Sequence, residues 1–192
     1  MAKNFSRHSF SRHRDAHLFG LLSEDQSTKD QAFTELYARH SSRVWLYCLK
    51  ITGDREAAED MFQETFLRFL QSAEVEREMT NVPAFLLRIA RNLCLNAKGK
   101  KRPVATPLEE PEFPVEEHPV EARELERLIS TALDLLSDEH REAFVLQAYN
   151  GMSYEEIADI IDRPVSTVRN RVVRAKKKMR EILAPYLVDY RE

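Results

Sequence analysis

The chain has 192 residues, 43% of them hydrophobic, and its 29 basic and 32 acidic residues give a net charge of −3. This length suits one domain or two small ones. No apolar run approaches the roughly 20 residues of a membrane-spanning helix, so we predict no membrane insertion. The first residues, MAKNFSRHSFSRHR, are polar and basic without an apolar core. They do not match a secretory signal peptide, and we expect 1–27 to be a disordered basic arm.

Three helical patterns of apolar residues follow within the segment 28–102. The first begins near Thr28 and ends at Gly53, a residue type that favours the helix C-terminus. Asp54 is suited to cap the second helix and Asn81 the third, because their side-chain oxygens accept backbone N–H groups at a helix start. No strand pattern is present, so we predict an all-α module.

Cys48 and Cys94 each fall within one of these apolar helical patterns. Buried thiols in a reducing cytosol are the expectation for such positions, and we predict a cytoplasmic protein. The sequence has no C-x-x-C pair, and its six histidines are scattered. We therefore predict no metal site and no cofactor.

The segment 103–120, PVATPLEEPEFPVEEHPV, holds five of the eight prolines and five glutamates, with no Lys or Arg. Such a composition does not build a packed core and favours an extended chain. We therefore predict a flexible acidic linker between the module 28–102 and a second helical module, 121–187.

Residues 153–180, SYEEIADIIDRPVSTVRNRVVRAKKKMR, predict a helix-turn-helix whose second helix is basic. Ser153 and Glu156 form the S-x-x-E pattern of a capped helix start. Asp162 stands at the turn, where many such units have glycine, and Asp tolerates the left-handed conformation better than most residues. From 163 to 180 there are eight Lys/Arg and no Asp/Glu. This helix suits a DNA major groove, although a solvated charged face is the alternative interpretation.

Three stretches carry a resemblance to a known family: AAEDMFQETFLRFL at 57–70, PAFLLRIARNLCLN at 83–96 and YEEIADIIDRPVSTVRNRVVRAKKKM at 154–179. In this order, with a short linker between the second and the third, they resemble a bacterial RNA polymerase sigma factor of the sigma-70 family, extracytoplasmic-function (ECF) subfamily. The resemblance implies an all-α fold of two small helical domains, a region 2 bundle and a region 4 helix-turn-helix, joined by the flexible linker.

The resemblance also implies a function. Such a protein is not an enzyme; it binds RNA polymerase core and directs promoter-specific transcription initiation. Region 4 reads the minus-35 element as duplex, and region 2 binds and melts the minus-10 element. The implied partners are the coiled coil of the largest polymerase subunit, promoter DNA and an anti-sigma factor. In this family the linker lies along the polymerase's RNA path, where its glutamates either mimic RNA phosphates or only keep it soluble.

The family's motifs assign three sets of site residues. The polymerase-binding set lies on the second helix: Asp60, Gln63 and Glu64. The minus-10 set lies on the third helix and just after it: Arg88, Arg91, Asn92, Asn96, Lys98, Lys100, Lys101 and Arg102. The minus-35 set lies on the recognition helix: Ser166, Thr167, Arg169, Asn170, Val173, Arg174 and Lys177. Phe85, Asn96 and Gly99 depart from the usual family residues, which affects the promoter sequence rather than the role.

Two other functions remain open from the residues alone. A helix-turn-helix regulator with an N-terminal dimerising module reads near-palindromic half-sites, but the sequence has no pattern of a dimeric coiled coil. An enzyme acting on nucleic acid, such as a recombinase, needs a nucleophile with its base or a carboxylate metal cluster. Asp60 and Glu64 share one helix face, but no third acidic ligand is placed near them. Binding to polymerase core distinguishes a sigma factor from both alternatives.

Overall fold

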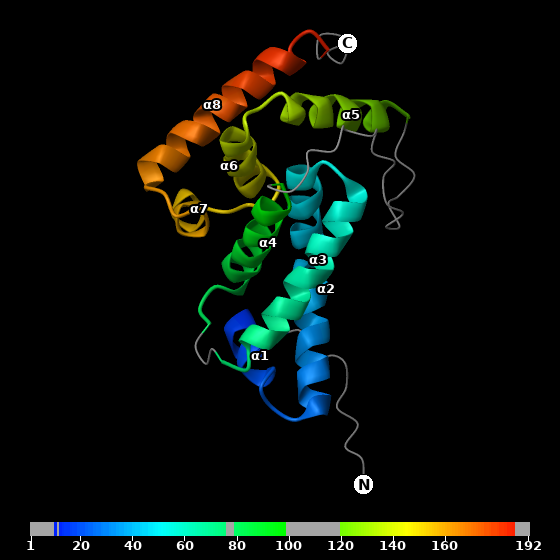
Figure 1. The fold of residues 1–192 in the computed structure, drawn as a ribbon, viewed down its shortest axis with the longest axis vertical. Coiled ribbons are helices and arrows are strands. Elements are labelled where there is room, and N and C mark those ends of the chain that lie inside the picture. Colours follow the sequence, from blue (N-terminus) through cyan, green and yellow to red (C-terminus); the bar gives the residue numbers. More distant parts are fainter. Residues whose placement is uncertain (1–9, 11, 76–78, 99–119, 187–192) are drawn as a thin grey trace.

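The structure is a computed structural model that describes residues 10, 12–75, 79–98 and 120–186 of the chain. These residues form α-helices and no strand, which confirms the predicted all-α class (Figure 1). The helices are α1 (Asp15–Leu21), α2 (Gln26–Thr52), α3 (Arg55–Ser72), α4 (Val82–Lys98), α5 (Val120–Asp134), α6 (Asp138–Ala148), α7 (Tyr154–Ile161) and α8 (Val165–Leu183). The predicted linker lies outside the described residues, except for Val120, which begins α5.

The first module is a bundle in which α2, α3 and α4 pack against one another. α2 begins slightly earlier than predicted because Asp25 caps it, and the Asp25 carboxylate accepts hydrogen bonds from the backbone N–H groups of Ser27 and Thr28. Gly53 ends α2 in the left-handed conformation with φ of +70°, and the Asp54 side chain caps α3. The predictions that Gly53 ends the first long helix and that Asp54 caps the next are confirmed.

A short helix, α1, packs on α2 and α4, and the prediction of a disordered arm over 1–27 is wrong for this part. Leu18 and Phe19 are buried. The ring centroid of Phe19 lies 5.4 Å from that of Phe69 and 6.4 Å from that of Phe85. Burying such side chains stabilises a fold by about 1.5–3 kcal/mol each, which favours an ordered α1.

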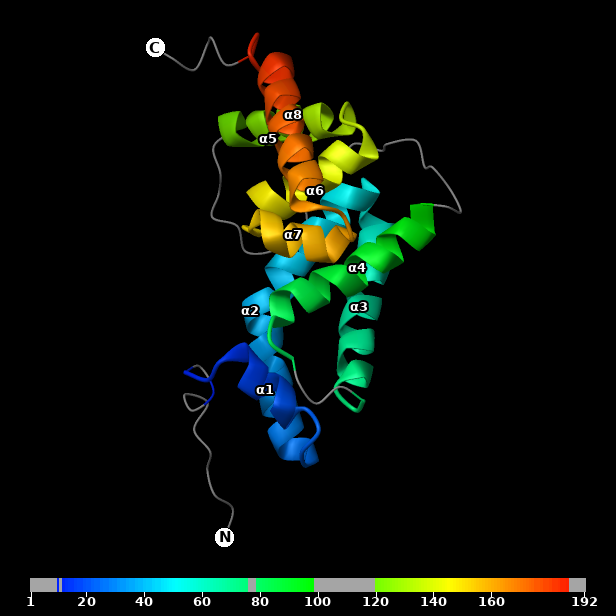
Figure 2. The same ribbon diagram turned by 90° about the vertical axis from the view of Figure 1, so that its left-hand side faces the viewer.

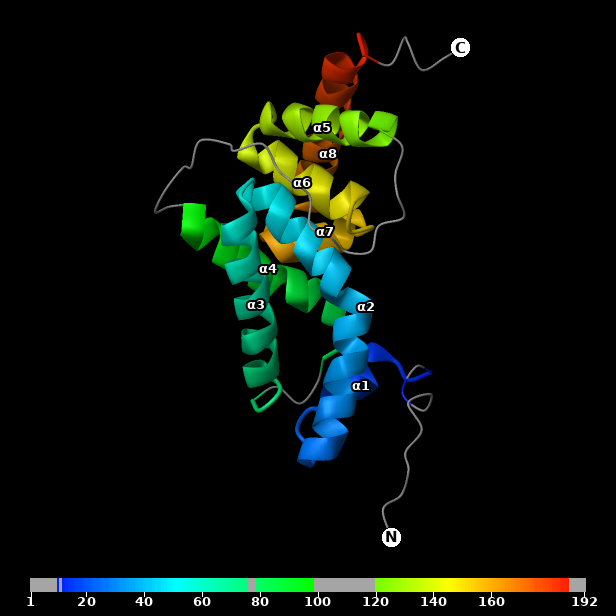
Figure 3. The ribbon, with the colours of Figure 1, turned by 90° about the vertical axis from the view of Figure 1, so that its right-hand side faces the viewer.

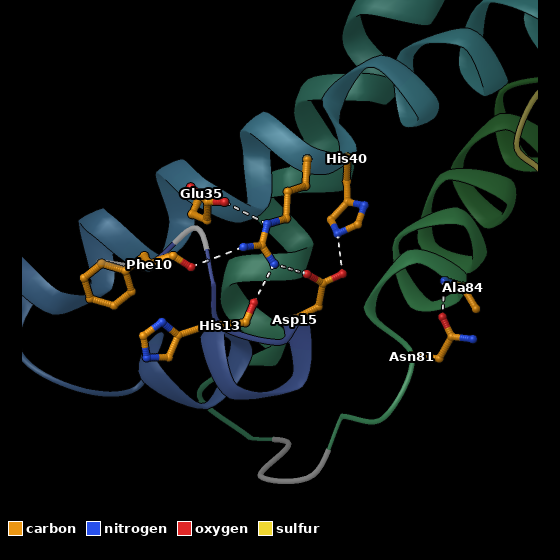
Figure 4. Close-up of polar contacts among 8 residues, drawn as sticks. Phe10, His13, Asp15, Glu35, His40, Asn81 and Ala84 are labelled. Atoms are coloured by element: carbon orange, nitrogen blue, oxygen red, sulfur yellow. Dashed lines mark hydrogen bonds and ion pairs between the residues drawn. The ribbon is translucent and has the colours of Figure 1, made fainter. Parts of the chain in front are cut away.

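Polar contacts fasten the start of α1 to α2 (Figure 4). The Arg39 guanidinium donates hydrogen bonds to Glu35 Oε1 at 2.8 Å, to Asp15 Oδ1 at 2.7 Å and to two backbone carbonyls that precede α1. The second carboxylate oxygen of Asp15 lies 2.8 Å from His40 Nε2. This network therefore joins the start of α1 and the residues just before it to the middle of α2.

The second module is built around α8, which packs against α5, α6 and α7. Four apolar side chains along one stripe of α8 are buried, as their spacing predicts: Val168, Val172, Ala175 and Met179. The last two of these belong to a separate apolar cluster that includes Leu133 and Leu136, at the C-terminal end of α5 and just after it. The stripe therefore joins α8 to all of its neighbours and leaves its opposite face to solvent.

The two modules also pack against each other, which the sequence patterns did not predict. α7 lies against α4, and α6 lies against α2 (Figures 2 and 3). A continuous cluster of buried apolar side chains runs from α1–α4 into α6–α8. The helix-turn-helix is therefore held beside the first module in this conformation.

Burial lowers the pKa of His40, although Asp15 opposes this effect. When Nε2–H donates to Asp15, protonation adds a proton at Nδ1, which is buried without a hydrogen-bond partner among the described residues. The nearby cations Arg43 and Arg39 act in the same direction as burial. The unfolded state therefore binds this proton more readily than the folded state, and stability falls as the pH drops below the ordinary His pKa of about 6.5.

We expect the free energy of unfolding to decrease when the pH is lowered from about 7.5 to about 5.5, across the His titration range. The variant His40→Gln keeps a donor to Asp15 but does not titrate, so its free energy of unfolding should decrease less over the same range. Urea denaturation followed by circular dichroism at each pH measures both proteins. Equal decreases would show that other groups account for the pH dependence.

Candidate nucleic-acid interface

α7 and α8 form the predicted helix-turn-helix, and local sequence fixes both its start and its turn. Ser153 Oγ accepts a hydrogen bond from the Glu156 N–H at 3.2 Å, and Glu156 Oε2 accepts one from the Ser153 N–H at 2.9 Å. This complete capping box confirms the sequence prediction. The backbone bond from Ser153 and a side-chain bond from Asn81 lower the pKa of Glu156. Asp162 has a φ of +52°, so it does supply the left-handed turn.

The minus-35 set lies together on the face of α8 opposite the buried stripe. Thr167 is half-buried, and the other members are exposed: Ser166, Arg169, Asn170, Val173, Arg174 and Lys177. Val173 has 56% of its surface exposed. An apolar side chain surrounded by cations and amides on an exposed helix face is suited to contact a partner such as a thymine methyl group. The structure thus places these residues on the solvent side of α8, and their contact with DNA stays a prediction.

Two contacts on α8 were not apparent from the sequence patterns. The guanidinium carbon of Arg169 lies 5.8 Å from the ring centroid of Tyr154, the first residue of α7, and such a cation–π contact contributes about 0.5–1 kcal/mol at an exposed site. Arg171 donates to Glu139 of α6 at 2.7 Å. These contacts restrict the orientation of Arg169 and bind Arg171 within its own module.

The minus-10 set divides into side chains that contact the second module and side chains that do not. Arg91 Nε donates to Glu142 Oε1 of α6 at 2.8 Å, and Arg88 Nη2 donates to the backbone carbonyl of Asp159 in α7 at 2.9 Å. Arg88 is exposed despite its contact, as are Asn92 and Asn96, whereas Arg91 is half-buried. Lys98 ends α4, and three members lie outside the described residues: Lys100, Lys101 and Arg102.

The polymerase-binding set lies on the outward face of α3. Asp60 and Gln63 are exposed, whereas Glu64 Oε1 accepts a hydrogen bond from Arg68 Nε at 2.6 Å. Leu67 stands one turn beyond Gln63 on the same face, with 55% of its surface exposed. The family motif gives Leu67 no role, although an apolar residue on an otherwise polar helix face was the available signal.

Other features of the described residues bear less directly on these surfaces. Cys48 and Cys94 are buried and form no disulfide, and their mutual hydrogen bond, together with burial, raises the pKa of the Cys48 thiol. No helix among the described residues is long and apolar enough to cross a membrane. Within the same residues, no three His, Cys, Asp or Glu side chains are grouped as metal ligands.

Two parts of the chain match protein-family models. Residues 36–103 match "Sigma-70 region 2", and residues 126–179 match "Sigma-70, region 4". The chain is also 34% identical, over 150 residues, to the ECF RNA polymerase sigma factor SigL of Mycobacterium tuberculosis, with 76% of this chain and 85% of SigL covered. The chain belongs to the ECF group of the sigma-70 family. As a sigma factor, it directs promoter-specific transcription initiation.

Two further similarities agree with this family. This sigma factor is 34% identical over 171 residues to the ECF RNA polymerase sigma factor SigE of Mycolicibacterium smegmatis, with 83% of this chain and 66% of SigE covered. The solved structure of the sigma factor RpoE in complex with the anti-sigma factor NepR, from Bartonella quintana, matches with a TM-score of 0.67 and 22% identity over 79% of this chain and 96% of that chain. At this identity, the structural match shows a shared fold.

The left-handed turn at Asp162 can be tested by substitution. Asp162→Val should lower the free energy of unfolding by about 1–2 kcal/mol, because a β-branched residue is strained in this conformation. Asp162→Gly should have a much smaller effect, because glycine adopts positive φ without a Cβ clash. Chemical denaturation of both variants measures the difference. A valine variant as stable as the wild type would contradict this turn geometry.

Proposed function

We propose that this sigma factor contacts a promoter at two separate places, with α8 on the minus-35 duplex and α4 on the melted minus-10 strand, while α3 docks on polymerase core. The exposed face of α8 carries the proposal, because its polar and basic side chains stand opposite a buried apolar stripe. An α-helix with its side chains is about 10–12 Å wide, and the major groove is about 12 Å wide.

For the minus-35 element, three side chains of α8 supply different base contacts. The guanidinium of Arg174 can donate two hydrogen bonds to guanine, the amide of Asn170 can both donate to and accept from adenine, and Val173 suits a thymine methyl group. The start of α8 carries two hydroxyl groups suited to phosphate, because a helix N-terminus attracts anions: Ser166 and Thr167. Lys177, nearly three turns further on, suits a phosphate of the same groove.

For the minus-10 element, α4 must hold bases that have left the stack, since unstacking costs a few kcal/mol. The amides of Asn92 and Asn96 donate and accept hydrogen bonds, so they suit base edges. Arg88 and Arg91 supply cations for the strand backbone, as single-strand grooves generally do. Cations at and beyond the end of α4 suit upstream duplex phosphates: Lys98, Lys100, Lys101 and Arg102.

The outward face of α3 suits the basic coiled coil of the largest polymerase subunit. Asp60, Gln63 and Glu64 give this face its polar and acidic character, which favours orientation and fast encounter with a cationic partner. Leu67, exposed beside them, provides an apolar centre that loses water on binding, as interface cores do. The proposed surface is therefore an acidic patch around one apolar anchor.

The proposal extends to regulation and location. The matched RpoE structure contains an anti-sigma factor, and we propose that this chain too binds an anti-sigma factor that holds it inactive. Its role includes no catalytic step of its own, and it acts in the cytoplasm, where polymerase and promoters are. A dimeric regulator remains a separate hypothesis, disfavoured because region 2 is among the matched segments.

The direct test mixes purified chain with polymerase core and a genomic promoter library. We expect discrete transcription start sites only when both proteins are present, a footprint in two separate blocks, and permanganate-reactive bases in the downstream block. The chain alone and core alone are the controls. Failure of the purified chain, without any anti-sigma factor, to associate with core would falsify the proposed function.

Charge reversal on α3 tests the polymerase surface. Asp60→Lys should weaken association with core by about tenfold, equivalent to about 1.4 kcal/mol, because it places a cation against a basic partner. Glu24→Lys, an exposed position between α1 and α2, makes the same charge change away from α3 and should bind core as the wild type does. Fluorescence anisotropy with labelled sigma factor measures both, and equal losses in the two variants would rule out a local surface at Asp60.

Two exposed cations of α8 should behave differently in the holoenzyme. Arg174→Ala should cost about 1–3 kcal/mol on the best promoter and relax the preference at one base pair, because a base contact is lost. Lys178→Ala should weaken binding to all sequences alike and lower the salt slope by about 1, because only a phosphate contact is lost. Binding of promoter variants at several salt concentrations separates the two effects. A uniform loss with Arg174→Ala would remove it from the base-reading set.

A further inference from the structure

We infer that Tyr154 is a positioning residue for minus-35 recognition: its ring holds the guanidinium of Arg169 on the exposed face of α8, so that Arg169 reads one guanine of the duplex. This inference rests on the proposed function, because it concerns the contact of α8 with the minus-35 element. Arg169 thereby gains a task among the residues of the recognition face, and α7 contributes a residue that lies outside the three assigned sets.

The contact joins the two helices of the helix-turn-helix near their N-terminal ends. Tyr154 is the first residue of α7, and Arg169 is the fifth residue of α8. The guanidinium carbon lies 5.8 Å from the ring centroid, within the distance of about 6 Å at which an aromatic face attracts a cation. Because α7 and α8 pack against each other (Figure 2), the motif itself brings the ring and the cation together.

The Tyr154 ring has a fixed place of its own. The capping box of Ser153 and Glu156 sets the backbone at the start of α7, and the half-buried ring packs against a cluster of buried apolar side chains that includes Ile157. A tyrosine has only two side-chain torsions, so fixing it costs little conformational entropy. The ring is therefore a rigid platform, whereas the long Arg169 side chain would otherwise sample many rotamers.

A ring restrains an arginine without using its hydrogen-bond donors. Arg171 donates to the Glu139 carboxylate at 2.7 Å, and only 14% of its side chain is exposed. By contrast, Arg169 is exposed, and the Tyr154 ring is the only partner of its guanidinium among the described residues. A cation–π contact engages the face of the planar guanidinium, so its five N–H donors and its positive charge stay available to DNA.

Arg169 also lies where a recognition helix reads bases. In helix-turn-helix proteins the N-terminal residues of the second helix contact base edges, while the first helix crosses the phosphate backbone. Asn170 and Val173 are exposed on the same face, but they suit adenine and thymine rather than guanine. Arg174 lies more than one helical turn beyond Arg169, so the two arginines suit two different base pairs.

Restraint before binding should improve both affinity and discrimination. A side chain that is ordered on binding loses rotamer freedom, and pre-organisation removes part of that cost. Bidentate pairing of arginine with guanine requires one plane and one direction of the guanidinium, and stacking on Tyr154 restricts both. A cation–π contact at an exposed site corresponds to about a two- to fivefold effect on an equilibrium constant.

The experiment measures binding of the holoenzyme to the best promoter and to copies in which the minus-35 base pairs are substituted one at a time. Arg169→Ala identifies the base pair that Arg169 reads, because substitution of this pair should no longer weaken binding of the variant. Tyr154→Leu keeps an apolar side chain but removes the ring. It should weaken binding of the unsubstituted promoter by about two- to fivefold and reduce the penalty at the same base pair. The salt slope should not change, because no phosphate contact is lost.

Further variants separate positioning from other roles. Tyr154→Phe keeps the ring and should bind as the wild type does. Tyr154→Leu combined with Arg169→Ala should bind no more weakly than Arg169→Ala alone, since the ring acts through this arginine. Arg169→Lys leaves α7 untouched and keeps the charge but not the fork of donors, so it should lose the same base preference. Tyr149→Leu is the matched control, because it removes a half-buried ring of the same module that contacts Lys50 instead, and it should leave the penalty at that base pair unchanged.

Circular dichroism and thermal unfolding establish that each variant is folded. A uniform loss on all promoters with Tyr154→Leu, or an equal loss with Tyr154→Phe, would indicate a phosphate contact of the phenol hydroxyl and overturn the inference. Tighter binding with Tyr154→Leu would also overturn it, because the ring would then hold Arg169 away from DNA. An unchanged base preference in Arg169→Ala, or an equal change with Tyr149→Leu, would do the same. Failure of the wild type to associate with core would end the proposed function and this inference together, and it is detected before any promoter is added.

Discussion

Each proposed binding surface of this sigma factor is the face that a helix leaves exposed after burying its apolar side. On α8, burial of Val168 and Val172 fixes which side chains point away from the module, since residues three or four positions apart share a face. On α3, burial of Phe66 and Phe69 does the same for the acidic face that begins at Asp60. Core packing therefore determines the direction in which the proposed binding residues point.

The features that the sequence predicted well depend on neighbours only a few residues away. Local residues determine three such features: the capping box of Ser153 and Glu156, the C-cap at Gly53 and the left-handed conformation of Asp162. Each of them appears in the sequence as a short pattern. The helix α1 is different. It has only 7 residues, too few to show a helical period, and Phe19 packs against rings that lie far away in the sequence.

The candidate site shows the same division. The side chains of α8 opposite its buried stripe are exposed because of the helical period alone. The sequence was therefore sufficient to predict that they lie on one face. The engagement of Arg91 by Glu142 joins positions 51 residues apart in different modules, and no local pattern marks either residue for that contact. A family motif indicates which residue occupies a position, but it does not indicate which other module covers that position in the unbound protein.

The Arg91–Glu142 contact is an ion pair between two modules, with both side chains largely buried. Transferring two charges out of water costs nearly as much as their attraction returns, so an intact buried ion pair adds little net stability, whereas an unpaired buried charge is strongly unfavourable. Glu142 and Arg91 therefore favour one register of the two modules over others without holding them together strongly. Because buried apolar side chains also join the modules, this ion pair accounts for how they are aligned more than for how strongly they associate.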